Sequence, residues 1–157
     1  MSVNAVEIAT AGVEDIADLA KLRAAWTAEE HSASDDPAFA DAFADWAARE
    51  MPQRRFWIAR LGGQPIGMVN LLQVVRMPAP GRVRPSWGYL NNMFVVPEHR
   101  SAGVGGQLLD ALLDHAKAMD LESIVLSPSE AAVPFYERHE FFSGMPFMLW
   151  LNGHSAR

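Results

Sequence analysis

The stretch from Trp87 to Leu126 restricts the fold of this chain more than any other. Apolar and alternating residues predict a strand over 87–96, which Pro97 ends. Leucines and alanines then recur at helical spacing over about 103–119, and a short buried strand is predicted over 123–126. A strand, a helix and a second strand in this order favour a right-handed crossover that pairs the two strands in parallel.

The rest of the chain supplies antiparallel strands and covering helices. Gly62-Gly63-Gln64-Pro65 is a strong hairpin signal between two apolar segments. Strands are predicted over 3–8, 56–61 and 66–75, and a final pair of strands over 141–151. One predicted helix carries Ile16, Leu19, Leu22 and Trp26 on one face. A second helix begins at Asp36-Pro37, and another covers 131–139. We therefore expect an α/β fold, a central mixed sheet of six to seven strands with about four helices, in a single domain over residues 1–157.

Composition excludes several classes of function. The 157 residues include no cysteine, so disulfides, thiolate zinc sites and cysteine nucleophiles are excluded. A net charge of −6 argues against nonspecific binding of nucleic acid. No apolar run reaches the ~20 residues of a membrane span, and the first residues do not look like a signal peptide. The five histidines show no metal-ligand spacing. We expect a cytoplasmic protein without a metal, a membrane or a nucleic-acid partner.

Three glycines stand where the helix after Pro97 begins: Gly103, Gly105 and Gly106. Glycine lowers helix propensity, so another role must compensate. Unpaired N–H groups at a helix start form an anion site, typically for phosphate. The P-loop pattern is absent because no Lys-Ser/Thr follows, and the dinucleotide pattern fails because Leu108 occupies the place of its last glycine. The alternative is a packing role alone.

Three motifs, in the right order, resemble signatures of the GNAT acetyltransferase superfamily. Arg100-Ser-Ala-Gly-Val-Gly105 is similar to its acetyl-CoA signature, in which Gln or Arg is followed after two residues by Gly and, two positions later, by Gly or Ala. Met93–His99 resembles the strand that precedes this signature, and Ala132–Phe141 resembles a downstream motif around Phe-Tyr-Glu. Two positions depart from the pattern: Glu140 replaces a usual Gly, and Ser129 replaces a frequent Asn.

The resemblance implies a GNAT-like acyl-CoA N-acyltransferase fold with acetyl-CoA as the acyl donor. Main-chain N–H groups of the glycine loop would wrap the CoA pyrophosphate, and a strand bulge near Asn92 would free groups for the pantetheine and the thioester. The implied donor-binding residues are Met93, Phe94, Val95, Arg100, Ser101, Ala102, Gly103, Val104, Gly105, Gly106, Ser129 and Tyr136. The side chain of Arg100 either adds charge to this site or is a solvated loop cation.

Catalytic roles are implied for Tyr136, Asn91 and Asn92. Tyr136 would protonate the departing thiolate; the alternative is an interior aromatic with a satisfied hydroxyl. Asn91 and Asn92 stand on the strand where many family members carry Glu or Asp, but an amide cannot act as a general base and at most orients a water. The charged residues after the first helix, Glu29, Glu30 and His31, either line the acceptor site or are surface charge. No base is identified.

The predicted activity is direct transfer of an acetyl group from acetyl-CoA to a primary amine of a small molecule or peptide. Aromatic and acidic residues over 26–43 favour a cationic amine with an apolar part. The basic loop with Arg76, Arg82 and Arg84 either recognises a carboxylate or keeps a hairpin soluble. The alternatives are a CoA-binding sensor without catalysis and a transferase for a longer acyl group. The resemblance also allows a homodimer.

Overall fold

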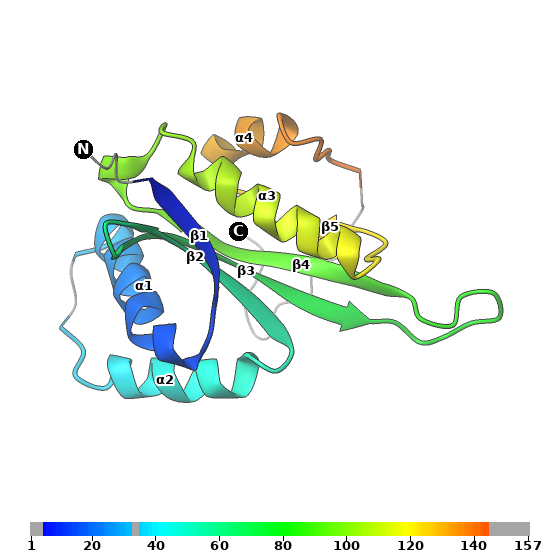
Figure 1. Cartoon of the computed structure of the whole chain (residues 1–157), viewed down its shortest axis with the longest axis horizontal. Coiled ribbons are helices and arrows are strands. Elements are labelled where there is room, and N and C mark those ends of the chain that lie inside the picture. The colour runs from blue at the N-terminus through cyan, green and yellow to red at the C-terminus, as the bar shows by residue number, and fades with distance from the viewer. Residues whose placement is uncertain (1–4, 33–34, 145–157) are drawn as a thin grey trace, which may run out of the picture. The chain divides into compact units, whose positions relative to one another are not determined.

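The computed structural model describes residues 5–32 and 35–144, and in these residues one sheet has five strands in the order β1-β2-β3-β4-β5 (Figure 1). The strands are β1 Val6–Ala11, β2 Arg54–Leu61, β3 Gln64–Val75, β4 Ser86–Val95 and β5 Ile124–Val125. The helices are α1 Ile16–Glu30, α2 Phe39–Glu50, α3 Val104–Ala118 and α4 Val133–Glu137. None of them has the length and apolar character that a membrane span needs.

The topology confirms the predicted mixed sheet. Strands β1 to β4 pair antiparallel, and β4 pairs with β5 in parallel after the crossover through α3. The final strand pair expected over 141–151 lies mostly outside the described residues, and residues 141–144 form no strand. Helix α4 is shorter than the predicted 131–139 because a 3₁₀ turn, Glu130–Ala132, precedes it.

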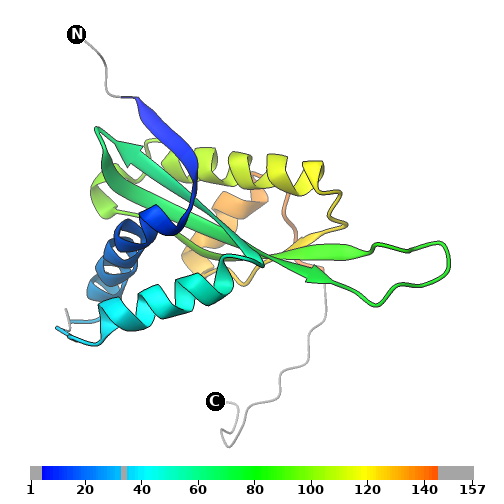
Figure 2. The same ribbon diagram turned by 60° about the horizontal axis from the view of Figure 1, so that its bottom comes forward.

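The chain divides into two compact units, residues 1–126 and 127–157, and each is described by itself. In the first unit, α1 and α2 cover one face of the sheet and α3 covers the other (Figure 2). Leu19 and Leu22 of α1 pack against apolar side chains of the sheet, namely Phe56, Ile58, Met68 and Phe94. On the other face, α3 buries Leu108, Leu109 and Leu112 completely. Burial of these side chains is the main source of stability.

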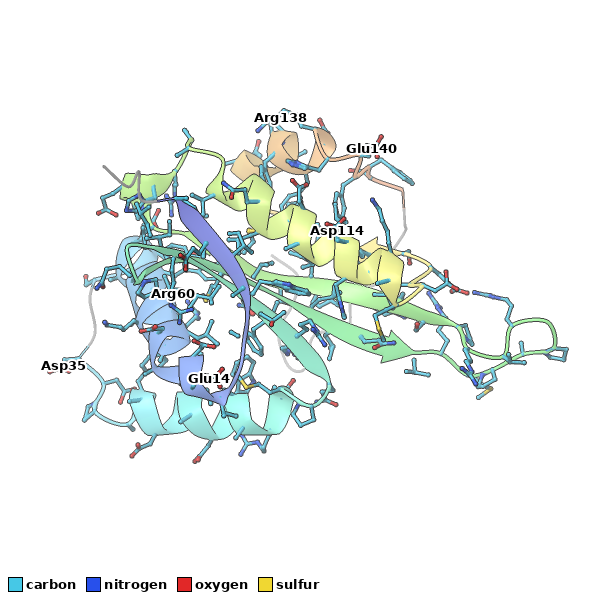
Figure 3. All side chains as sticks on the ribbon, viewed as in Figure 1. Glu14, Asp35, Arg60, Asp114, Arg138 and Glu140 are labelled. Carbon is cyan, nitrogen blue, oxygen red and sulfur yellow. The ribbon has the colours of Figure 1, made fainter. Side chains whose placement is uncertain are left out.

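Arg60 ties β2 to the start of α1 (Figure 3). Its Nη2 donates to Asp15 Oδ1 at 2.6 Å and to Asp18 Oδ2 at 2.9 Å. Asp15 also accepts the N–H of Gly12. These contacts place the first helix along the sheet at a defined position, which matters because the other end of α1 reaches the candidate site.

Gly67 on β3 allows close approach of α3 to the sheet. A Cβ at this position would lie 3.1 Å from Leu108 Cδ1 and 3.1 Å from the main-chain oxygen of Phe94, which cannot rotate away. Gly67→Val is therefore expected to lower the free energy of unfolding by about 1–3 kcal/mol, measured by urea denaturation. Ala9→Val, on an exposed position of β1, is the control and should change it by less than about 0.5 kcal/mol. Equal midpoints for the two variants would contradict this packing.

Candidate functional site

Strand β4 carries the predicted bulge at Asn92. Met68 faces Phe94 across the β3–β4 pair, whereas Asn70 faces Asn91, so β4 holds one extra residue between these two pairs. Asn92 has a φ of 56°, in the left-handed region that Asn adopts more readily than most residues. The bulge reverses the alternation of side chains, and Asn91 and Phe94 therefore point to the same face, the one that α1 and α2 cover.

Beside the bulge, β4 has an open edge. β5 pairs with β4 only at Gly88 and Tyr89, and no other described strand pairs with this edge. The N–H of Val96 donates to the oxygen of Ile66 on β3 at 2.9 Å. Main-chain groups alternate along an antiparallel strand, so those of Val95 face the open edge, whereas those of Phe94 face β3. The splayed edge thus presents main-chain donors and acceptors that the sheet does not use.

The glycine loop lies between this edge and α3. Ser101 and Gly103 have φ values of 62° and 83°, and Gly103 is the N-cap of α3. Left-handed residues of this kind turn successive N–H groups toward one side, which is typical of anion-binding nests. In residues 5–32 and 35–144, no acceptor is found for the N–H groups of residues 101–106, and residues 101–103 are exposed. The predicted anion site therefore has free donors at the positive end of a 15-residue helix.

Arg100 connects the glycine loop to both β4 and α1. Its Nη1 and Nη2 donate to the two carboxylate oxygens of Glu29 at 2.6 Å each, and its Nε donates to the oxygen of Val95 at 2.9 Å. Hydrogen bonds from Arg100 lower the pKa of the Glu29 carboxyl. The sequence suggested a donor contact or a solvated loop cation for Arg100; in the structure its exposed guanidinium joins the end of α1 to the loop.

An aromatic stack lies next to this contact. Trp26 of α1 stacks on Phe94 with ring centroids 5.6 Å apart and planes 4° apart, and Phe94 is buried. The guanidinium carbon of Arg23 lies 4.9 Å from the centroid of the Trp26 ring, and Trp26 donates its Nε1–H to Glu30 at 2.9 Å. Protein groups thus already engage Trp26, which reduces the case for a cation–π contact between Trp26 and a substrate amine.

The sequence did not predict the polar partners of the Asn92 side chain. Arg54 at the start of β2 contacts Glu50 of α2 at 3.1 Å and donates from Nη1 to Asn70 Oδ1 at 2.8 Å. Asn70, 1% exposed, donates from Nδ2 to Asn92 Oδ1 at 2.9 Å. Asn91, by contrast, bonds only to the oxygen of Tyr89 within the described chain, at 3.3 Å. One signal was available: an Asn between Val69 and Leu71, in the middle of an apolar strand.

Tyr136 and Ser129 belong to the second unit. Tyr136 is 7% exposed and packs edge-on against Phe135 and Phe141, with centroids 5.0 and 5.6 Å away. Burial raises the pKa of its hydroxyl to about 12. Ser129 is the exposed residue before the 3₁₀ turn, and its oxygen accepts the N–H of Ala132. Glu140 has a φ of 66°, so it adopts the left-handed conformation that a Gly would favour at this turn.

A groove of about 640 Å³ lies elsewhere in the first unit. It is formed by the end of β1, the segment from Met51 to Arg55, the second half of β3 and the end of α3. Neither the glycine loop nor the bulge lines it. The groove is therefore separate from the glycine loop and the open edge, although Arg54 borders it.

Comparisons with known proteins agree with this geometry. Residues 17–141 match the model of the acetyltransferase (GNAT) family. The chain is 37% identical over 60 residues to an uncharacterized N-acetyltransferase of Bacillus subtilis (38% of this chain, 43% of that one) and 28% identical over 102 residues to a probable N-acetyltransferase of Mycobacterium tuberculosis (61% and 55%). It thus spans about half the length of the curated relatives it matches.

A solved structure shows the same fold. A protein from Clostridium acetobutylicum that is described as a predicted acetyltransferase, with acetyl-CoA in its crystal structure, superposes with a TM-score of 0.78 at 22% identity; the match covers 94% of this chain and 96% of that one. The family match includes the bulged strand, the glycine loop and the Tyr136 segment. The chain belongs to the acetyltransferase (GNAT) family.

Proposed function

We propose that this protein transfers an acetyl group from acetyl-CoA directly to a primary amine of a small molecule or a peptide, and that residues 1–157 act as one domain. The observation that carries the proposal is the continuity of the open β4 edge with the free N–H groups of the glycine loop. The family match crosses the boundary between the two compact units, which supports a single working domain.

The donor site follows from these free groups. A pyrophosphate fits the N–H groups of residues 101–106 because they gather at the positive end of α3. The amide-containing pantetheine arm suits the open edge at Met93 and Val95, where it would add hydrogen bonds in the manner of a further strand.

The chemistry needs a nucleophile, a stabilised oxyanion and a proton. The neutral amine attacks the thioester carbon, and the carbonyl oxygen gains negative charge; the C–S bond then breaks and the thiolate leaves. Tyr136 would give its proton to this thiolate and later regain one from solvent. With a pKa of about 12, the Tyr136 hydroxyl is protonated at neutral pH and therefore has a proton to give. Asn91 and Asn92 take up no proton, so the amine loses its own to water.

Purified protein incubated with acetyl-CoA and a panel of amines tests the proposal. We expect free thiol to appear only with acceptor amines, and mass spectrometry of the products to show one added acetyl group. Tight CoA binding with no thiol release from any amine would favour a sensor instead. A longer acyl-CoA is supplied in a parallel reaction. If the protein prefers it and adds the heavier group to the amine, that acyl group replaces acetyl as the transferred group.

The contact with Glu29 predicts a small role for the Arg100 side chain in donor binding. Because Glu29 occupies both ends of the guanidinium fork, Arg100→Ala should change the Kd of acetyl-CoA by less than about threefold. Glu29→Gln leaves the positive charge uncompensated near the loop, so it should bind acetyl-CoA equally well or more tightly. Isothermal titration calorimetry measures both. A loss of about tenfold or more in Arg100→Ala would show that this cation contacts the donor.

A further inference from the structure

A chain of four side chains runs from α2 to the bulge of β4. It consists of Glu50, Arg54, Asn70 and Asn92, with contacts of 3.1, 2.8 and 2.9 Å in that order. Arg54 and Glu50 are mostly covered, with side-chain exposures of 14% and 22%, and Asn70 is 1% exposed. A buried polar chain is costly unless each member is satisfied, so its presence under the bulge calls for a purpose.

The arginine sets the direction of every hydrogen bond in this chain. A guanidinium has donors only, so the Asn70 atom that faces Arg54 must be the oxygen. The Asn70 nitrogen therefore faces Asn92, and the Asn92 atom that receives it must again be the oxygen. The orientation of an isolated Asn amide is ambiguous. Here the Arg54 cation determines the orientation of the Asn70 amide, and through Asn70 that of the Asn92 amide.

The consequence is an amide donor at the bulge. With its oxygen bound to Asn70, Asn92 has both N–H groups of Nδ2 left over, and within the described chain no acceptor takes them. Asn92 is half-buried, and no buried side-chain nitrogen or oxygen in the described residues lacks a partner, so this nitrogen is exposed to solvent. The bond to Asn70 places the Asn92 side chain on the face of α1 and α2, and the backbone of Asn92 belongs to β4, which has the open edge.

Building on the proposed function, we propose that Arg54 and Asn70 are positioning residues that hold the Asn92 amide as a hydrogen-bond donor to the thioester carbonyl oxygen. The left-handed backbone of Asn92 aims the side chain, and Asn70 keeps it from rotating. The donor gains strength as the oxygen becomes negative during attack by the amine. This assigns to Asn92 the role of an oxyanion donor, in place of a base or a water-orienting group.

The test reverses the direction of the hydrogen bond between Asn70 and Asn92 and keeps the size of the side chains. In Asn70→Asp the new carboxylate keeps its partner Arg54 but has no donor for Asn92, whose amide must turn its nitrogen inward and its oxygen toward the substrate. Asn92→Asp also presents an oxygen to the substrate, here on the half-buried residue itself. Gln64→Glu, at an exposed position of the same strand β3, is the matched control.

We expect kcat to fall about tenfold to a hundredfold in both variants, with the KM of acetyl-CoA and the thermal midpoint close to those of the wild type. The kcat of Asn92→Asp relative to the wild type should rise again toward pH 4, where a protonated carboxyl donates. Wild-type kcat in either folded variant would overturn the inference and leave the proposed function standing. A wild-type protein that transfers no acetyl group would instead overturn the proposed function, and the inference with it.

Discussion

Gly105→Asp is expected to raise the Kd of acetyl-CoA about a hundredfold while the fold stays at least as stable as before. Gly105 is the second residue of α3, where its N–H group points out of the helix start. A carboxylate there interacts favourably with the helix dipole, and the loss of a glycine lowers the entropy cost of the helix. The same negative charge would sit against the pyrophosphate of the donor and repel it. Stability and affinity thus move in opposite directions.

Gly105→Asn is the control that separates the effect of the negative charge from the effect of side-chain size. It fills the same volume without a charge, so most of the affinity should return if repulsion is the cause. The difference in Kd between the Asp and Asn variants should also shrink as the salt concentration rises. Calorimetry gives the affinities, and thermal unfolding gives the stabilities. Equal affinity of Gly105→Asp and the wild type would place the pyrophosphate elsewhere and remove the basis of the proposed donor site.

Tyr136→Phe is expected to lower kcat about a hundredfold and leave the KM of acetyl-CoA nearly unchanged. The substitution removes only the hydroxyl, and the ring contacts with Phe135 and Phe141 remain. A proton donor acts when the thiolate forms, after the donor has bound, so its loss appears in turnover. Steady-state kinetics with the best amine of the panel provide the measurement.

The chain has only two tyrosines, so Tyr89→Phe is a natural control and should keep wild-type turnover.

A pH titration of stability gives a second readout for Tyr136. The Tyr136 hydroxyl ionises near pH 10 in the unfolded chain and near 12 when folded, so stability from this group is complete below pH 10 and is lost between pH 10 and 12. The loss amounts to about 2–3 kcal/mol and should be absent in Tyr136→Phe. Unchanged kcat in Tyr136→Phe would leave this residue a purely structural one.

Features that depend on neighbours along the chain were predictable from the sequence. The hairpin at Gly62-Gly63, the crossover through α3 and the glycine-rich start of that helix all follow from local residue preferences. The bulge was implied by the family resemblance, and the Asn91-Asn92 pair, which is unfavourable in a regular strand, suits it. Glu140, a departure from the family pattern, adopts a left-handed conformation that Gly favours.

Contacts between distant segments came from the fold alone. Arg100 and Glu29 lie 71 residues apart, and Asn70 and Asn92 lie 22 apart. Whether such side chains meet depends on strand register and on the position of α1 along the sheet, and a shift of one residue would turn each strand side chain to the opposite face. Residue types and local periodicity thus identify the glycine loop, and the resemblance of three motifs to known signatures implies the bulge and the family. The partners of Arg100 and Asn92, which determine what these side chains are free to do, arise from long-range packing.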